Sequence, residues 1–405
     1  MTIEIRILDS EDDLIAAANV FRAAMVGIPP LSNLPPGQIT KLLEPGRTVG
    51  AFVGGQLVGT ADAATSRLTL PGGAIVEHAA VTHIGVLPSF TRKGIATALM
   101  DHQLLDIAAR GEVVATLRAS EATIYERYGY GVASSSQTVE VQTARAALRP
   151  GIGAGGPVRL LDEAETWDVL PRIYAGNRPS RPGTIDRPGV WWQGLRLRTE
   201  LSSGASYVAV HGGPGSESGF TRYRPVDTDA WFVSDQRTIV VEDFFAPTTE
   251  AYLGLLRFLL GLDLIDRVVF WSLPVDDPLP WLLLDRRAVR VTAVHDETWL
   301  RIIDAQKALA ARGYVGDGAV AIAVDDPLLA NNSAAFTITG DGAEQTGRRA
   351  QLHVGVAGLA AVLLGGTTWR GLAVAGLARA ADPAALVVAD RLFAVREAPY
   401  AGFFF

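Results

Sequence analysis

The pattern of apolar and polar residues in the first part of the chain predicts strands and helices that follow one another in turn. Strict alternation, typical of a half-buried strand, runs through Thr2–Leu8 and returns in a hairpin about residues 54–55. A polar and acidic helix start at Ser10–Asp13 lies between them. A longer strand at Ala74–Val86 leads into residues with helical spacing over Thr91–Arg110. This region is therefore predicted to be a sheet covered by helices.

Two further segments and one loop complete the first region. Val113–Leu117 predicts another strand, and Glu121–Tyr128 predicts a short helix after it. The proline-rich segment Gly27–Gly46 favours an irregular loop that faces the substrate.

Two glycine-rich segments admit both a functional and a structural interpretation. Arg149–Pro157 contains G-x-G-x-x-G at Gly151, Gly153 and Gly156, which indicates dinucleotide binding when it opens a helix. Because a strand pattern follows it here, we interpret the segment as a flexible linker at a domain boundary.

His211–Gly215 resembles an oxyanion loop of α/β-hydrolases, but the chain has no G-x-S-x-G nucleophile elbow. A hairpin turn is the favoured interpretation.

The middle of the chain repeats the order of strands and helices without the same motifs, as a degenerate duplicate would. Strand Thr238–Asp243, helix Thr249–Leu260 and strand Arg267–Ser272 illustrate this order. Beyond residue 291 the pattern changes to short strands and a small apolar helix that ends in Gly-Gly at Gly358–Gly366. We therefore expect a mixed α+β fold with three domains, at 1–148, 149–291 and 292–405.

Composition and charge exclude several classes of protein. The chain has no cysteine, which removes disulfide frameworks, thiolate zinc sites and cysteine nucleophiles, and we expect no metal site. The net charge of −7 disfavours nucleic acid as a partner, because phosphate binding needs a concentrated basic surface. No segment approaches the ~20 apolar residues of a membrane helix, and no signal-peptide pattern is present. We expect a cytoplasmic protein that binds neither nucleic acid nor membrane.

The segment best suited to chemistry is the turn between the strand that ends at Val86 and the helix that follows. This turn consists of Thr91, Arg92, Lys93, Gly94, Ile95 and Ala96. A helix N-terminus leaves backbone N–H groups unpaired and carries partial positive charge, which suits a phosphate. Gly94 and Ala96 keep side chains out of its way, and Arg92 and Lys93 add charge. A basic first turn is unfavourable for the helix itself, so a binding site is favoured over an ordinary helix start.

The turn resembles the acetyl-CoA motif Q/R-x-x-G-x-G/A of the GCN5-related N-acetyltransferases. Gly94 and Ala96 match the small positions, whereas Thr91 stands where Gln or Arg is usual. In that family the strand before the turn diverges from its neighbour, and its backbone pairs with the pantetheine arm. The resemblance assigns this role to Ile84, Gly85 and Val86.

Residues 118–131 resemble the A-S-E-x-x-I-Y-x-R-F-G-Y-G segment of the Eis (enhanced intracellular survival) acetyltransferases, and Trp299–Ile302 adds a further match. Members of this family have two acetyltransferase-like domains followed by a sterol-carrier-protein-like domain. The resemblance implies the same architecture for this chain. It also implies that Ser120 and Glu121 contribute to acetyl-CoA binding.

The same resemblance implies the catalytic groups. Tyr125 corresponds to the family's general acid, and a phenol of pKa ~10 protonates a thiolate of pKa ~8.5 only when positioned and desolvated. The base corresponds to the terminal carboxylate, here on Phe405, and three consecutive phenylalanines favour a buried tail over a frayed one. His83 is expected to be an ordinary strand residue, and Tyr128 and Tyr130 are expected to serve packing.

These features predict direct transfer of acetyl from acetyl-CoA to a primary amine, such as an aminoglycoside, a polyamine or a lysine-like group. The resemblance also implies a homohexamer. One alternative is a lipid- or acyl-ligand-binding protein that uses the last domain, with apolar segments such as Val354–Leu364 lining a tunnel. A hydrolase is disfavoured by the missing nucleophile elbow.

Overall fold

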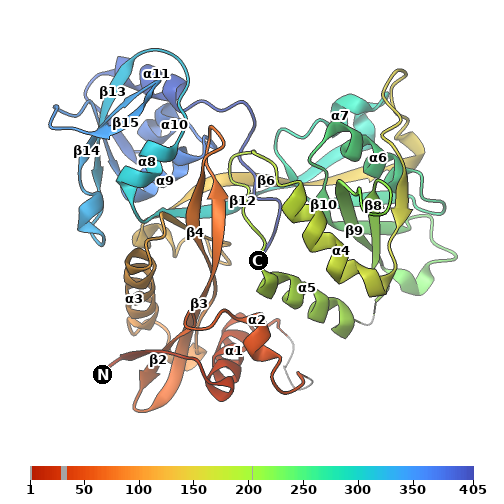
Figure 1. The fold of residues 1–405 in the computed structure, drawn as a ribbon, viewed down its shortest axis with the longest axis horizontal. Coiled ribbons are helices and arrows are strands. Elements are labelled where there is room, and N and C mark those ends of the chain that lie inside the picture. The colour runs from red at the N-terminus through yellow and green to blue at the C-terminus, as the bar shows by residue number, and fades with distance from the viewer. Residues whose placement is uncertain (1, 29–33, 203) are drawn as a thin grey trace.

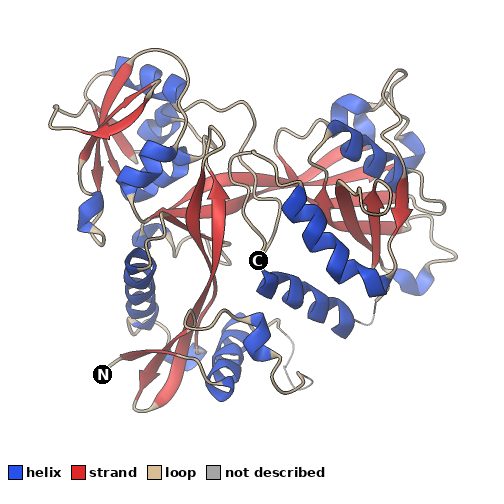
Figure 2. Ribbon diagram, viewed as in Figure 1, coloured by secondary structure: helices blue, strands red, loops and turns tan. Residues whose placement is uncertain are grey.

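The computed structural model describes residues 2–28, 34–202 and 204–405. A large twisted sheet extends through the first and middle regions of the chain, and a smaller sheet near the C-terminus forms a separate layer (Figures 1 and 2). Within the described ranges, no helix is both long and apolar enough to cross a bilayer. Residues 29–33 of the predicted loop Gly27–Gly46 lie outside the described residues.

Among the described residues, twelve strands form the large sheet, and two of its neighbouring pairs are parallel. In spatial order the strands are β1 (Glu4–Ile7), β2 (Val49–Val53), β3 (Gln56–Thr69), β4 (Ile75–Val86), β5 (Val114–Leu117), β12 (Val289–Ile302), β6 (Tyr130–Gln142), β11 (Arg267–Pro274), β10 (Thr238–Phe245), β9 (Gly219–Val226), β8 (Tyr207–His211) and β7 (Val158–Leu160). The parallel pairs are β4 with β5 and β10 with β11.

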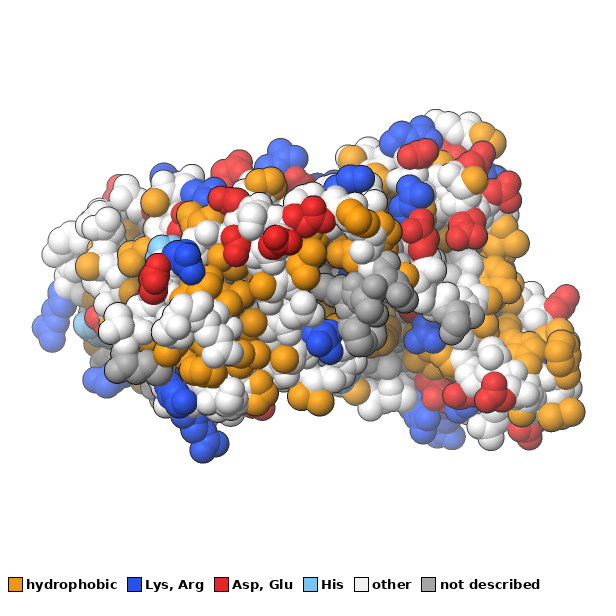
Figure 3. Space-filling model, turned by 90° about the horizontal axis from the view of Figure 1, so that it is seen from below, with side chains coloured by type: hydrophobic (Ala, Val, Ile, Leu, Met, Phe, Trp, Pro, Cys, Tyr) orange, Lys and Arg blue, Asp and Glu red, His pale blue; other side chains and the backbone are white. Residues whose placement is uncertain are grey.

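Helices pack against this sheet in both halves. They are α1 (Glu11–Met25), α2 (Ile39–Leu42), α3 (Ile95–Ala109), α4 (Glu163–Gly176), α5 (Gly189–Leu201), α6 (Thr249–Leu260) and α7 (Leu279–Leu282). In the first half α1 and α3 contact β3 and β4, and in the middle region α6 contacts β8 and β9. On the surface seen from below, acidic and basic side chains lie interspersed (Figure 3).

One long strand joins the two halves of the large sheet. β12 pairs with β6 along most of its length and with β5 through Trp299–Ile302. The predicted domain boundary between residues 291 and 292 falls inside this strand. A strand late in the chain therefore completes the sheet of the first region.

The last region forms its own layer. Its sheet contains, in spatial order, β15 (Gly342–Gln345), β14 (Ala335–Thr339), β13 (Ala319–Asp325), β16 (Leu352–Gly355) and β17 (Ala378–Ala380). Its helices are α8 (Ala305–Ala311), α9 (Val356–Leu363), α10 (Trp369–Val374) and α11 (Pro383–Leu392).

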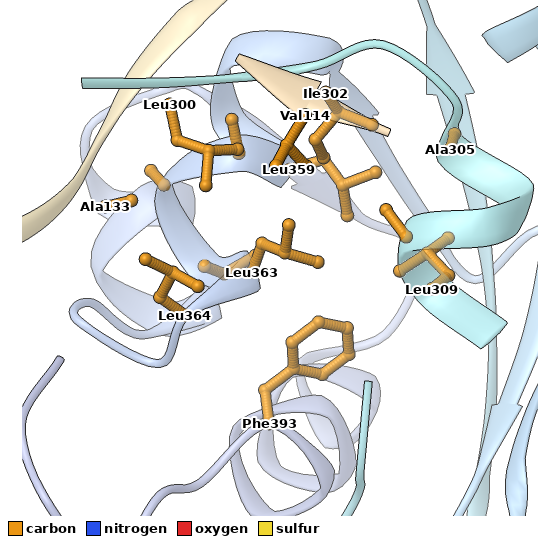
Figure 4. Close-up of a cluster of buried hydrophobic side chains, with 14 of the residues drawn as sticks. Val114, Ala133, Leu300, Ile302, Ala305, Leu309, Leu359, Leu363, Leu364 and Phe393 are labelled. Carbon is orange, nitrogen blue, oxygen red and sulfur yellow. The ribbon is translucent and has the colours of Figure 1, made fainter. Parts of the chain in front are cut away.

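The apolar helix α9 attaches this layer to the large sheet. Leu359 and Leu363 are fully buried and face Val114, Leu300 and Ile302 of the sheet (Figure 4). Full burial of one leucine contributes about 1.5–3 kcal/mol. Leu359 and Leu363 of the segment Val354–Leu364 are thus core residues, because their side chains pack against the sheet.

The glycine-rich segments have the structural roles that were favoured, with one difference. Arg149–Pro157 is irregular and precedes strand β7, but it is docked and does not hang free. The carbonyl oxygen of Gly155 lies 2.7 Å from Nε2 of His211, and a Cβ on Gly155 would lie 2.2 Å from the backbone nitrogen of Gly254 in α6. His211 ends β8, and the hairpin turn after it is confirmed.

Candidate active site

Strands β4 and β5 run parallel and then separate, which leaves an open backbone edge on β4. They pair only over His78–Ala80 and Val114–Thr116. Farther along, β4 pairs with β3 alone, so the edge away from β3 has no strand partner within the described residues. Such an edge is suited to hydrogen bonding an extended ligand. The predicted pantetheine positions along this edge are Ile84, Gly85 and Val86.

Gly85 allows helix α1 to approach one face of β4 closely. A Cβ at this position would lie 3.0 Å from Cβ of Ala24 and 3.1 Å from Cα of Phe21. A larger residue would therefore push α1 away from the strand.

His83 lies in an irregularity of β4 that was not predicted. It is a strand residue, as expected, but its φ of +50° is in the left-handed region that residues other than glycine rarely adopt. The ring nitrogen Nδ1 lies 3.3 Å from Oδ2 of the buried Asp62, and the ring meets Phe21 edge-on at a centroid distance of 4.9 Å. The side chain is thereby fixed beside the open edge.

The turn between β4 and α3 presents unpaired backbone N–H groups. Helix α3 begins at Ile95 and not at Thr91, because Arg92 (φ +60°) and Gly94 (φ +81°) are left-handed. No side chain in the described part of the chain caps the helix start, so the first N–H groups remain available to a ligand. Thr91, Arg92, Lys93 and Gly94 are exposed. The geometry of the turn fits a pyrophosphate.

The segment that follows β5 lies against this turn. The hydroxyl of Tyr128 is 3.2 Å from that of Thr97, which follows the half-buried Ala96 in the first turn of α3. At the start of the segment, Ser120 and Glu121 are exposed. The two groups of predicted cofactor residues thus come from neighbouring elements.

The predicted helix over Glu121–Tyr128 is wrong. The segment forms turns and then a short 3₁₀ helix over Glu126–Tyr128. Gly129, with φ +84°, ends it. A segment this short has too few backbone hydrogen bonds to form a stable α-helix by itself, so its tertiary contacts decide its conformation.

Tyr125 is buried within this segment, with 6% of its surface exposed. Its ring packs against Tyr130 and Trp299 at centroid distances of 6.1 and 6.4 Å. Burial raises the pKa of the Tyr125 phenol, the Ser120 hydroxyl acts in the opposite direction, and Tyr128 adds to the rise. The phenol is therefore protonated at neutral pH, as a proton donor must be.

The end of the chain returns to the same segment. Phe405 stacks on Trp191 of α5, with ring centroids 4.6 Å apart and planes 7° from parallel. The guanidinium carbon of Arg118 lies 5.0 Å from the Phe405 ring, and Nη2 of Arg118 donates to the carbonyl oxygen of Phe403 at 2.8 Å. Because Arg118 directly follows β5, the C-terminus lies beside the segment that carries Tyr125, between the two halves of the large sheet (Figure 1).

Several side chains that hold the chain end carry no local sequence signal. They are Arg118, Trp191, Arg187 and Glu297. Arg118 is the one of the four that adjoins a motif, because it directly precedes the Ala-Ser-Glu of the predicted catalytic segment. Among the described residues, no three or more His, Asp or Glu side chains gather in a way that would hold a metal ion.

Three family models match the chain in succession. Residues 4–133 match an acetyltransferase (GNAT) domain, and residues 183–302 match a second acetyltransferase (GNAT) domain model. Residues 305–402 match the sterol carrier protein domain. The expected fold class, with two acetyltransferase domains followed by a sterol-carrier-like domain, is confirmed.

Relatives extend the match over almost the whole chain. The crystal structure of Eis1 from Mycobacterium abscessus is 47% identical and covers 99% of this chain and 100% of its own, with a TM-score of 0.92. The N-acetyltransferase Eis of Mycobacterium tuberculosis is 36% identical over 287 residues, or 68% of each chain. An uncharacterized N-acetyltransferase of Streptomyces avermitilis is 35% identical over 369 residues, or 88% of each chain. The chain therefore belongs to the Eis family of acetyl-CoA-dependent N-acetyltransferases.

Proposed function

We propose that the protein transfers the acetyl group of acetyl-CoA directly to a primary amine at the divergence of β4 and β5. The open edge at Ile84–Val86 binds the pantetheine arm, and its N–H groups polarise the thioester carbonyl. The uncapped start of α3, with Arg92 and Lys93, binds the pyrophosphate. Most of the acceleration comes from holding the amine and the thioester together.

Tyr125 is the general acid of this reaction. The amine nitrogen attacks the thioester carbonyl carbon, the C–N bond forms and the C–S bond breaks. Tyr125 then protonates the departing CoA thiolate. The observation that carries the proposal is the buried, protonated phenol of Tyr125 in a segment that contacts both the first turn of α3 and the chain end.

The terminal carboxylate of Phe405 is the base. An α-carboxyl group of pKa ~3.5 is ionised at neutral pH and accepts the proton that the amine loses. Support comes from the stacking of the Phe405 ring between Trp191 and Arg118, which holds the chain end beside the catalytic segment.

The acceptor belongs to the class of small primary amines, which includes aminoglycosides, polyamines and lysine-like groups. The protein works as a homohexamer, as the family resemblance implies, and light scattering on the purified protein measures this directly. The lipid-binding alternative has less support, because the large side chains Leu359 and Leu363 of the apolar segment Val354–Leu364 are packed against the sheet.

The first experiment replaces Tyr125 by phenylalanine. Loss of a general acid slows turnover by about 10²–10⁴-fold, whereas acetyl-CoA binding measured by calorimetry persists. Tyr130→Phe is the matched control, because Tyr130 is buried beside Tyr125 and its hydroxyl has no partner within the described residues. Equal turnover in Tyr125→Phe and Tyr130→Phe, with a panel of amines, would contradict the assignment.

Removal of Phe405 tests the base. Turnover falls strongly while the KM for acetyl-CoA stays near its original value, since the open edge of β4 and the start of α3 are untouched. Unchanged turnover of this shortened chain would show that another group takes the amine proton.

A further inference from the structure

The middle half of the large sheet contains a second divergence of parallel strands. β10 and β11 pair only over Thr238–Val241 and Arg267–Phe270. Farther along, β10 pairs with β9 as far as Phe245, while β11 pairs with β6 as far as Pro274. In the first half of the sheet, the corresponding divergence of β4 and β5 forms the proposed acetyl-CoA site.

Residues 398–405, called the tail from here on, lie against this second divergence. The hydroxyl of Tyr400 donates to the carbonyl oxygen of Ser272 on β11 at 2.9 Å. Before it, the carbonyl oxygen of Ala398 accepts from Nε of Arg181 at 2.7 Å, and the Ala398 N–H donates to Asp276 at 2.8 Å. The tail also forms one wall of a cavity of about 550 Å³ whose other walls include the ends of β10 and β11. Part of the second divergence is therefore occupied by the protein's own chain.

An ion pair connects the tail to the other diverging strand. Arg187 donates to Asp243 of β10 through two nitrogens, at 2.6 and 3.2 Å, and both side chains are buried. The same guanidinium donates to the carbonyl oxygen of Gly402 at 2.8 Å and lies 4.5 Å from the ring centre of Phe403. The tail is thus held from β10 as well as from β11.

Glu297 on β12 holds the opposite side of the tail. Its carboxylate accepts the N–H groups of Ala401 and Gly402 at 3.2 Å each. It also accepts the hydroxyl of Ser134 at 2.7 Å, and Nη2 of Arg118 lies 3.9 Å away. Since Glu297 is 7% exposed, its carboxylate binds these protein groups in place of water.

Gly402 is the point at which the two sets of contacts meet. Its N–H faces Glu297 and its carbonyl oxygen faces Arg187. It adopts a φ of +69°, and a Cβ there would lie 3.2 Å from the Tyr400 ring. Only glycine adopts this conformation without strain.

We propose that the diverging strands of the middle domain have become a socket for the tail, and that Glu297 and Arg187 are positioning residues that set the place of the Phe405 carboxylate in the first domain. This inference rests on the proposed function, because it concerns the base of that reaction. It gives the second acetyltransferase domain a task other than binding acetyl-CoA. The divergence of β10 and β11, which the tail occupies, thus helps to build the site in the other half of the sheet.

The test uses the full-length protein and compares Glu297→Gln with Glu112→Gln. Glu112 is also buried and paired with an arginine, Arg47, but it does not contact the tail. Hydrogen exchange followed by mass spectrometry reports on the amides of Ala401 and Gly402. In Glu297→Gln these amides exchange about tenfold faster or more, because one carboxylate acceptor is replaced by an amide donor. The kcat falls by a similar factor while the KM for acetyl-CoA is unchanged, and Glu112→Gln leaves both the exchange and the kcat unchanged.

A second variant acts within the tail alone. Gly402→Ala places a Cβ at a left-handed position and crowds the Tyr400 ring, and it changes no residue outside the tail. It gives the same combination of faster tail exchange and lower kcat. Two results would overturn the inference. One is that the tail amides exchange as slowly in Glu297→Gln and Gly402→Ala as in the original protein. The other is that these amides exchange faster while the kcat is unchanged.

The chain that lacks Phe405 separates the inference from the proposed function. If its turnover collapses while the Ala401 and Gly402 amides remain protected, both the socket and the role of the carboxylate are supported. If its turnover is unchanged while these amides remain protected, the carboxylate is not the base and the socket still holds the tail. Loss of protection on removal of Phe405 alone would contradict a socket that holds the tail through residues 398–403.

Discussion

The two divergences of parallel strands in the large sheet have the same topology and different helix starts. After β4, the turn into α3 contains Arg92, Lys93 and the left-handed Gly94, and no side chain caps the helix. After β10, the turn into α6 is Ala246-Pro247-Thr248, and the Thr248 hydroxyl accepts the N–H of Ala251 at 3.1 Å. One helix start is left free for a ligand, and the other is satisfied by its own chain.

Diverging parallel strands alone therefore do not make a cofactor site. An uncapped, cationic helix start is less stable by itself, because a cap contributes about 1 kcal/mol and positive charge opposes the helix dipole. Such a start is useful only where an anion binds. In the middle domain the helix start is capped, and part of the tail lies in the divergence of its strands.

The largest expected effect concerns acid stability at the first divergence. His78 is fully buried where β4 and β5 still pair, with Nε2 2.7 Å from the Thr116 hydroxyl. Burial, with a smaller contribution from nearby arginines, lowers the pKa of His78 from 6.5 to about 3. Because the folded-state pKa is depressed, the contribution of neutral His78 is complete above pH 6.5 and is lost as the pH falls from 6.5 towards about 3.

Unfolding measured at several pH values checks this prediction. The free energy of unfolding falls by up to about 1.4 kcal/mol per pH unit in that window, and His78→Gln removes this slope. His353→Gln, at an exposed position, is the control and leaves the slope unchanged. The middle divergence has no histidine among its paired residues, so acid opens the first divergence before the second. An unchanged slope in His78→Gln would break this comparison.

An intermediate effect is expected at Gly94. A Cβ there meets nothing within 4 Å, so the left-handed φ of +81°, and not space, requires glycine. Gly94→Val strains the turn, and the KM for acetyl-CoA rises about tenfold with little change in kcat. Gly94→Asn has a smaller effect, since asparagine tolerates this conformation. Equal KM values for Gly94→Val and the original protein would show that the turn does not bind the cofactor.

The smallest effect is expected at the corresponding helix start of the middle domain. Thr248→Ala removes the cap of α6 and lowers the free energy of unfolding by about 1 kcal/mol. The KM for acetyl-CoA is unchanged, because this helix start binds no cofactor. Denaturant unfolding and steady-state kinetics measure the two quantities, and a raised KM would assign the second divergence a part in cofactor binding.

Local patterns were enough to predict many elements and to propose a site. Helix α6 spans Thr249–Leu260 as predicted, because its apolar residues recur at helical spacing and Thr248 marks its start. The turn of Arg92 and Gly94 was proposed as a phosphate site from residue types that a phosphate needs, and it stays a prediction.

Other features depend on contacts between distant segments and have no local pattern. The pairing of β12 with β5 and β6 joins segments far apart in the chain, and it is decided by the assembled sheet. The left-handed conformation of His83 and the contacts of Glu297 with the tail are likewise set by tertiary structure. They could not be predicted from residue types or spacing.

Because β12 pairs with strands of both halves of the large sheet, the first domain depends on a strand encoded far from it. A shortened chain that ends before Val289 would leave β5 and β6 with open edges where β12 pairs with them. Open edges of this kind favour aggregation. The first domain expressed alone is therefore expected to aggregate, although its family match ends at residue 133. Recombination between members of this family is expected to preserve both halves together, with the strand that joins them.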